Sequence, residues 1–235
     1  KEEIDVSQTI ADDKCSDFLC DDLPKISTNQ SKECDKEITE EEVRNILFRG
    51  LNRKKSPGND GLTVGLFQVL WELLEPYFMR CLKIAIEKGQ LACSQRQGIV
   101  KLIEKKNKDR RLIENWRPIS LLNVDTKIFS KVLANRIKKV LPDIISENQT
   151  AFISGRFIGE GTQLIQGIID HCKNIENAGL LVAIDFKKAF DSINHKYLLK
   201  TLSHFGFGHS FIQMVTTLIN GAENAILNNG ATSHY

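Results

Sequence analysis

The spacing of apolar residues along the chain predicts a protein built mainly from amphipathic helices, with a few short strands. In the longer segments apolar positions recur every three or four residues, which is the period of one helix face. This spacing predicts helices over 39–54, 62–88, 125–141, 161–175, 195–203 and 210–219. Apolar runs of strand length predict strands over 98–106, within 115–123, over 180–184 and within 224–233. Helices packed on a small, mostly antiparallel sheet define an α+β fold.

Capping and breaking residues indicate where several helices begin and end. In "TEEE", Thr39 can cap a helix while the Glu42 side chain bonds back to the Thr39 amide, which is a capping box. Pro76 is expected to split or kink the long helical segment, and Pro142 to end the next helix. Gly89 suits the left-handed position that follows a helix.

Charge is unevenly distributed along the chain. Residues 1–42 carry 14 acidic and 5 basic side chains, so a net charge of +2 for the whole chain leaves +11 for the remainder. A body this basic favours a polyphosphate partner such as nucleic acid, because lysine and arginine displace condensed counterions. The polar, acidic residues 1–37 show no apolar period and are predicted to be a disordered or loosely packed linker.

Composition argues against several other classes of protein. No apolar run approaches the ~20 residues of a membrane helix, so no membrane partner is expected. The six cysteines form no C-x-x-C pair, which argues against a zinc site or a disulfide framework. Reduced thiols fit an intracellular protein. The chain begins with Lys1 rather than Met, so we expect it to be part of a longer protein.

The stretch "LLVAIDFKKAFDSIN", residues 180–194, places a carboxylate directly after an apolar run. A buried carboxylate without a partner is costly, so Asp185 needs a cation, hydrogen-bond donors or water. It could cap the following helix or pair with Lys187 or Lys188. It could also bind Mg²⁺, which takes one or two protein carboxylates together with phosphate oxygens. The residue pattern leaves both alternatives open.

Four segments, in the same order along the chain, resemble blocks of the reverse transcriptases of non-LTR, LINE-type retrotransposons. "AIDFKKAFDSINHKYLLKTL" resembles their first catalytic palm motif, and "KKSPGNDGLT" resembles the segment ahead of their fingers. "VKLIEKKNKDRRLIENWRPISLLNVDTKIFSKVLANRIKKVLPDII" is similar to the fingers, and "QTAFISGRFIGE" to the block that follows. The four segments lie between Lys54 and Leu202, and the resemblance is taken to cover residues 40–235.

The resemblance implies a right-hand polymerase fold, of which this chain holds the fingers and the beginning of the palm. We expect a linker over 1–37, a fingers-like region over 38–178 and the N-terminal part of the palm over 179–235. The aspartate pair that supplies the family's other metal ligands does not follow Asp185, and neither a thumb nor an endonuclease domain is visible. We therefore expect a truncated fragment that synthesises no DNA by itself.

The resemblance also implies roles for residues of the palm motif. Asp185 matches the catalytic aspartate that binds two Mg²⁺ ions, and the carbonyl of Phe186 matches a further metal ligand. The amides of Lys188 and Ala189 match groups that face the incoming triphosphate. Phe190 matches the residue under the nucleotide sugar, where a bulky ring would clash with a 2′-OH and select deoxynucleotides.

Residues of the fingers have further implied roles. Lys105 and Arg117 match side chains that bind the phosphates of the nucleotide. Glu104 stands where the family usually has proline, and its charge could weaken phosphate binding or pair with Lys106. Asp191 is expected to cap the helix that follows it rather than to bind metal. Residues expected to approach the template are Lys54, Lys55, Ser56, Gly58, Gly155 and Arg156, with Pro57 stiffening the first turn.

The implied function is that of an RNA-directed DNA polymerase, a nucleotidyltransferase in which a primer 3′-OH attacks the α-phosphate of a deoxynucleotide. Its partners would be an RNA template, a DNA primer or target, and deoxynucleoside triphosphates. Copying at a chromosome would place the protein in the nucleus. Two alternatives are a non-catalytic nucleic-acid-binding remnant or repurposed fingers module, and a group II intron maturase-like protein. The wording "NWRPISLLNVDTKI" favours the LINE type.

Overall fold

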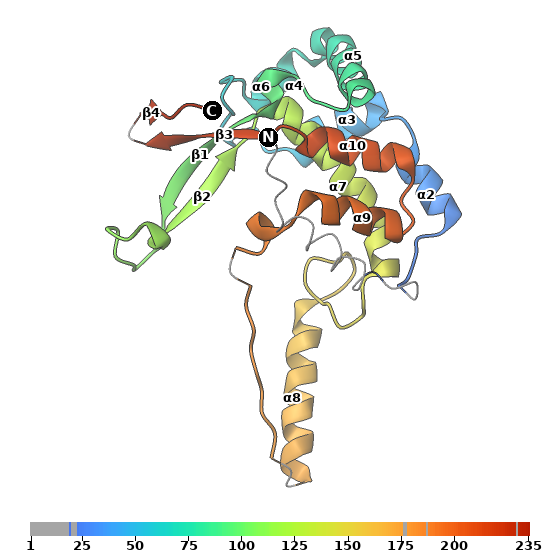
Figure 1. The fold of residues 1–235 in the computed structure, drawn as a ribbon, viewed down its shortest axis with the longest axis vertical. Coiled ribbons are helices and arrows are strands. Elements are labelled where there is room, and N and C mark those ends of the chain that lie inside the picture. Colours follow the sequence, from blue (N-terminus) through green and yellow to red (C-terminus); the bar gives the residue numbers. More distant parts are fainter. Residues whose placement is uncertain (1–18, 20–22, 176–177, 187, 229) are drawn as a thin grey trace, which may run out of the picture. The chain divides into compact units, whose positions relative to one another are not determined.

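The computed structural model describes residue 19 and residues 23–175, 178–186, 188–228 and 230–235 (Figure 1). The chain divides into two compact units. Unit 1 comprises Lys1–Asp35 and Arg136–His209, and unit 2 comprises Lys36–Asn135 and Ser210–Tyr235. Each unit is therefore assembled from stretches that are separate in the sequence.

Unit 2 contains helices from both of its stretches. They are α3 (Glu40–Asn45), the π-helical turn η1 (Ile46–Gly50), α4 (Val64–Val69), α5 (Trp71–Lys88), α6 (Cys93–Arg96), the 3-10 turn η2 (Ile113–Asn115) and nearly all of α10 (His209–Ile219). The first part of α7 (Val124–Ile144) also belongs to this unit. None of the helices that the structure describes is long and apolar enough to span a bilayer.

The core of unit 2 lies where α3, η1, α4 and the start of α5 meet the first half of α7. The buried side chains that pack together there are Val43, Ile46, Leu47, Val64, Phe67, Trp71, Val124, Ile128 and Val132. Trp71 is 1% exposed, and its indole N–H donates to the carboxylate of Glu75 at 3.1 Å. Phe78 meets the Trp71 ring edge-on, with the ring centroids 5.6 Å apart. Removing this apolar surface from water is the main force holding the helices together.

The sheet of unit 2 has four strands in the order β2-β1-β3-β4. β1 (Gln97–Glu104) pairs antiparallel with β2 (Trp116–Leu121) and parallel with β3 (Glu223–Asn228). β3 in turn pairs antiparallel with β4 (Ala231–Thr232). Two of the three pairings are antiparallel, so the α+β class with a small, mostly antiparallel sheet is confirmed.

Unit 1 is helical in its described residues. It contains α2 (Thr28–Asp35), the second part of α7, α8 (Ile158–Asn174), the 3-10 turn η3 (Phe190–Ser192) and α9 (His195–His204). Residues 23–37 were expected to be disordered or loosely packed, and this is wrong for them. Ile26 and Cys34 are 7% and 3% exposed, and the buried Arg136 donates to the Cys34 carbonyl at 2.8 Å. Two buried side chains in a polar segment leave no periodic signal in the sequence.

The apolar run over 180–184 is not a strand in the structure, so this prediction is wrong. Residues 178–186 have no sheet partner among the described residues, and Leu180 and Ile184 are 89% and 81% exposed. Figure 1 shows the segment running back beside α8. Residues 178–181 and the side of α8 that carries Ile165 and Ile168 line an open pocket there. A β-strand requires hydrogen bonds to a neighbouring strand. An apolar run indicates that a segment favours burial, but it does not show that another strand pairs with it.

Local signals predicted several helix ends correctly. The Glu42 amide donates to Thr39 Oγ1 at 3.2 Å and the Thr39 amide to the Glu42 carboxylate at 3.1 Å, so the capping box is confirmed. Gly89 ends α5 with a left-handed φ of 67°, which is also confirmed. The predicted cap at Asp191 is wrong. The cap of α9 is Asn194, whose Oδ1 accepts from the second and third amides of the helix.

The two prolines interrupt helices less than expected. The long segment breaks at Leu70 rather than at Pro76, which lies inside α5, and α7 continues through Pro142 to Ile144. Pro76 lies in the second turn of α5 and Pro142 in the last turn of α7, so each removes one intrahelical hydrogen bond, to the carbonyl four residues earlier, without ending the helix at its own position. Packing of the neighbouring apolar residues then decides where the helix ends.

Candidate functional site

The β1–β2 hairpin of unit 2 presents an exposed, cationic face. The register pairs Lys101 with Ile119 and Ile103 with Arg117, and all four side chains are exposed. Because side chains alternate between the two faces of a sheet, these four share one face. Residues 101–117 contain seven basic and three acidic side chains, a net charge of +4. A hairpin with this net charge attracts phosphate groups.

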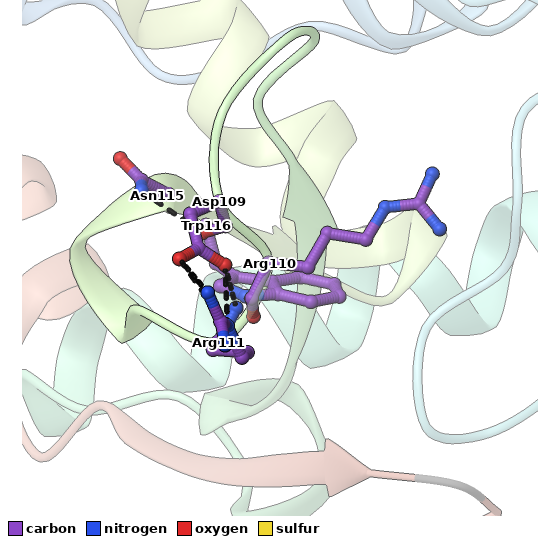
Figure 2. A network of polar contacts seen from close by, with 5 residues as sticks. All are labelled: Asp109, Arg110, Arg111, Asn115 and Trp116. Atoms are coloured by element: carbon purple, nitrogen blue, oxygen red, sulfur yellow. Dashed lines mark hydrogen bonds and ion pairs between the residues drawn. The ribbon is translucent and has the colours of Figure 1, made fainter.

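The loop that joins β1 to β2 is ordered by its own side chains (Figure 2). The Arg111 guanidinium donates to both carboxylate oxygens of Asp109, with an Nη2–Oδ2 distance of 3.0 Å. The Asn115 side-chain amide donates to the Asp109 carbonyl and the Trp116 indole N–H to the Arg110 carbonyl, both at 2.9 Å. Figure 2 shows Asp109 and Arg111 facing each other, whereas the Arg110 side chain points away from them.

The two side chains expected to bind phosphate differ in their contacts. The Lys105 ammonium donates to the Glu114 carbonyl at 2.8 Å. The Arg117 guanidinium is exposed and has no hydrogen bond or ion pair within the described part of the chain. Glu104 pairs with Arg110, at 2.5 Å from Oε2 to Nε, and not with Lys106, the partner considered for it from the sequence. The negative charge beside Lys105 is therefore matched by an arginine of the same hairpin.

The pKa of Asp109 offers a direct test of the loop network. The hydrogen bonds from Arg111 lower the pKa of the Asp109 carboxyl below its ordinary 3.8. The Asp109 carboxyl has a lower pKa in the folded protein than in the unfolded protein. Its hydrogen bonds from Arg111 therefore stabilise the fold fully at pH values above the ordinary pKa, and this stabilisation is lost as pH falls through the folded pKa. We expect an NMR titration of Asp109 to give a midpoint below 3.8, and Arg111→Ala to raise it toward 3.8, with the backbone amide of residue 111 still donating to Asp109 Oδ1 and lowering the pKa. Lys108→Ala, which also removes a positive charge, should change it little. An unchanged midpoint in Arg111→Ala would contradict the network.

The turn over 56–61 is fastened to the start of α7 within unit 2. The Asp60 amide donates to Asn123 Oδ1 at 3.4 Å, and Asn123 is only 2% exposed. The Lys127 ammonium donates to the Ser56 carbonyl at 3.1 Å. Partial burial lowers the pKa of Lys127, since desolvation disfavours the charged form, while the charge of Asp60 opposes this shift. These contacts hold the turn in one conformation.

The expected template residues of this turn divide into two groups. Lys54 and Lys55 have exposed side chains and can present charge to a phosphate backbone. Ser56 and Gly58 instead hold the turn in place. A Cβ at Gly58 would overlap the side chain and amide of Asn123 and meet the Leu122 carbonyl carbon at 2.5 Å. Only glycine fits this close approach between turn and helix.

Gly58→Ala should destabilise the chain by about 1–3 kcal/mol, because the added methyl group forces the turn away from α7. The matched control is Gly65→Ala in α4 of the same unit, where the nearest atom to a Cβ is 3.7 Å away. That substitution should be neutral or stabilise by about 0.5–1 kcal/mol through its helix propensity. Urea denaturation of the two variants measures both effects as shifts of the midpoint at constant slope. Equal midpoints would show that the turn is not tightly packed.

Asp185 lies at the end of the extended segment 178–186 of unit 1, with its side chain exposed. The neighbouring Phe186 is 79% exposed. No ion pair joins Asp185 to Lys188 in the described residues, and Lys187, the other partner considered for it, lies outside them. The carboxylate is therefore accessible to a ligand.

A tight turn follows the Asp185 segment. Lys188 has a φ of 53°, a backbone angle that residues other than glycine rarely adopt. Its carbonyl accepts both the amide and the hydroxyl of Ser192, at 3.1 and 2.9 Å. Ala189 comes next, and the ring of Phe190 is 90% exposed. Lys188, Ala189 and Phe190, the residues expected to face a nucleotide, therefore lie in an exposed turn.

The described residues contain no cluster of three or more His, Cys, Asp or Glu side chains that could hold a metal ion. Asp185 offers one carboxylate. Mg²⁺ is commonly held by one or two carboxylates together with water and substrate phosphates, so the oxygen chemistry of Asp185 fits a hard cation. Asp185 could bind such an ion only together with further ligands.

The loop between α7 and α8 carries Gly155, with a φ of 84°, and Arg156. The Arg156 guanidinium donates to the carbonyls of Ser146 (2.5 Å), Gln149 (2.8 Å), Pro142 (3.2 Å) and Ile145 (2.7 Å). The same loop holds Phe152 at a φ of 64° with its side chain 95% exposed. Sequence reasoning missed Phe152, because an aromatic residue in a loop gives no signal of its backbone conformation.

Residues 103–235 match the model of the family described as reverse transcriptase (RNA-dependent DNA polymerase). Since the match spans more than half of the sequence, the chain belongs to the reverse transcriptase family. Its relatives show that it is of the non-LTR retrotransposon type.

Three relatives illustrate the comparison. The chain is 37% identical over 214 residues to the transposon TX1 uncharacterized 149 kDa protein of Xenopus laevis, covering 91% of this chain and 16% of that protein. It is 27% identical over 160 residues to a putative 115 kDa protein of the R1DM element of Drosophila melanogaster (66% of this chain, 15% of that protein). It is also 27% identical over 173 residues to the probable RNA-directed DNA polymerase from the Drosophila melanogaster X-element (71% and 19%). The chain thus spans less than a fifth of each relative's length.

Proposed function

We propose that the chain is part of an RNA-directed DNA polymerase of a LINE-type retrotransposon, which joins deoxynucleotides to a primer 3′-OH. One observation carries the proposal. The range that matches the reverse transcriptase family, 103–235, contains every residue predicted to bind nucleotide or metal. The Drosophila melanogaster X-element relative, whose printed name is probable RNA-directed DNA polymerase, supports the same activity.

The proposed roles in the β1–β2 hairpin follow from its charge. Arg117 offers a planar fork to phosphate oxygens, and Lys105 a mobile point charge. The exposure of Arg117 on the cationic face supports a phosphate-binding role. Lys54 and Lys55 are proposed to contact the template backbone, and Gly155 is proposed as a further template contact.

The proposed roles near Asp185 concern metal and nucleotide. Reverse transcriptases use divalent metal ions, which stabilise charge on the reacting phosphate and on both oxygens of an in-line displacement. We assign the Asp185 carboxylate and the Phe186 carbonyl as ligands of two Mg²⁺ ions. The amides of Lys188 and Ala189 would bind the triphosphate, and the Phe190 ring would lie under the sugar. The exposure of Asp185, Phe186 and Phe190 supports access for these partners.

The experiment that tests the proposal is RNA-templated primer extension by a polypeptide that contains this chain together with the flanking sequence of its natural protein. We expect incorporation of deoxynucleotides that requires Mg²⁺, an RNA template and a primer 3′-OH. Absence of synthesis with all four deoxynucleotides, from a protein that is folded and binds template and primer, would contradict the proposal.

A second candidate function is a non-catalytic nucleic-acid-binding module, favoured by the net charge of +4 on residues 101–117. Titrating the chain with single-stranded RNA at 50 and 200 mM salt measures this binding directly. An electrostatic interface should lose affinity steeply as salt rises, with a slope of about −0.7 per phosphate contact on single strands. Binding without synthesis in the longer polypeptide would favour the module over the enzyme.

The proposed partners are an RNA template, a DNA primer or target and deoxynucleoside triphosphates. A LINE-type polymerase that primes at a chromosome would act in the nucleus, and we propose this location for the full protein. Imaging of the tagged full protein, with Asp185→Asn as a matched inactive form, tests the location independently of activity. Exclusion of both forms from the nucleus would contradict it.

A further inference from the structure

Arg156 lies at the C-terminal end of α7, and main-chain carbonyls surround its guanidinium. The last four carbonyls of a helix have no partner within the helix. Arg156 satisfies one of these, at Pro142, and that of Ile145 just beyond the helix. Its other terminal nitrogen donates to the carbonyls of Ser146 and Gln149 in the loop. One side chain therefore joins the helix end to the loop that follows it.

The chemistry of arginine suits this arrangement. Its planar guanidinium holds two terminal nitrogens in a fixed fork, and its positive charge complements the negative end of the helix dipole. Lysine offers one flexible ammonium with three donors, so it cannot replace all four of these hydrogen bonds. A phosphate bound by both terminal nitrogens of Arg156 would compete with all four of these hydrogen bonds.

We propose that Arg156 is a positioning residue, which fixes the loop over 145–157 against α7, and that it is not a phosphate contact on the template. Ile153 is a second anchor of the loop, because it is only 7% exposed. Directly before Ile153 the loop holds Phe152 in a left-handed conformation with its ring turned to solvent. The proposal revises the template role expected for Arg156 and does not depend on the polymerase function.

Hydrogen exchange measured by mass spectrometry on the whole chain tests the proposal without any ligand. Two loop amides report on the cap: Gln149 N–H, bonded to Ser146 O at 3.0 Å, and Arg156 N–H, bonded to Ile153 O at 3.3 Å. Arg156→Ala should speed exchange of the peptide over 145–157 by about 10-fold or more. Arg156→Lys should do nearly the same, because it keeps the charge but not the fork. Lys139→Ala, which removes an exposed charge from α7, should leave exchange unchanged.

The same variants, titrated with an oligouridylate RNA over a range of salt concentrations, separate positioning from phosphate binding. Positioning leaves the slope of log affinity against log salt as in the parent chain, whereas loss of a phosphate contact lowers its magnitude by about 0.7 in Arg156→Ala. Unchanged exchange in Arg156→Ala, parental protection in Arg156→Lys, or a reduced salt slope would each overturn the proposal. If the chain binds no RNA, exchange alone decides, so failure of the proposed function stays distinguishable.

Discussion

Asp185→Asn should lower the rate of RNA-templated primer extension by about 10³-fold or more in a polypeptide that contains this chain and copies RNA. The amide is nearly isosteric with the carboxylate but carries no charge, and hard cations such as Mg²⁺ depend on anionic oxygen ligands. Loss of several kcal/mol of transition-state stabilisation corresponds to this fall in rate. The side chain is exposed, so the substitution should leave folding intact.

The matched control for Asp185→Asn is Asp170→Asn on α8, a partly exposed carboxylate of the same unit that accepts from Gln166. It should keep at least half of the parental rate, because it removes one surface charge for which no catalytic or binding role is proposed. RNA affinity should be the same in both variants. Full extension by Asp185→Asn would remove Asp185 from the catalytic residues, whatever the control shows.

Phe190→Ala should raise the incorporation of ribonucleotides relative to deoxynucleotides by about 10²-fold. The expected discrimination is steric, since a ring under the sugar leaves no room for the 2′-OH, and a single hydroxyl is commonly rejected by about this factor. The ring is 90% exposed in the structure, so removing it opens space without leaving a core cavity. Single-turnover kinetics with dCTP and CTP on the same primer measure the ratio.

Two further variants make the Phe190 result specific. Phe190→Tyr keeps the ring and should keep the parental preference for deoxynucleotides. Phe157→Ala removes another exposed ring of the same unit, 66% exposed, and should leave the ratio unchanged. An unchanged ratio in Phe190→Ala would show that the sugar is selected elsewhere.

Structural features that depend on residues close together in the sequence were predicted correctly. The capping box at Thr39 and the left-handed Gly89 are set by side chains within a few residues, and both are present in the structure. The incorrect predictions concern features that depend on contacts between residues far apart in the sequence. The run over 180–184 has strand composition but no paired strand among the described residues, and Ile26 and Cys34 are buried by contacts from far along the chain. The apolar periodicity of a segment predicts its secondary structure but not which other segment of the chain it contacts.

The candidate site shows the same division. The family resemblance implied that Lys105 and Arg117 bind phosphate, and the register places the exposed Arg117 on the same sheet face as Lys101. The ion pair of Glu104 with Arg110 could not be read from the sequence, because it depends on how the loop folds back. Arg156 was expected to approach the template, and its four carbonyl contacts could not be read from the sequence because they depend on where α7 ends.

The parallel pairing of β1 with β3 has a consequence for synthesis of the protein. A ribosome that adds about 5–20 residues per second needs roughly 6–25 s to make the chain between Gln97 and its register partner Glu223. During that interval one edge of an apolar strand stays open on the nascent chain, and open edges of this kind invite aggregation. Chaperone binding to the newly made GIVKLI segment would shield it until the last strands emerge.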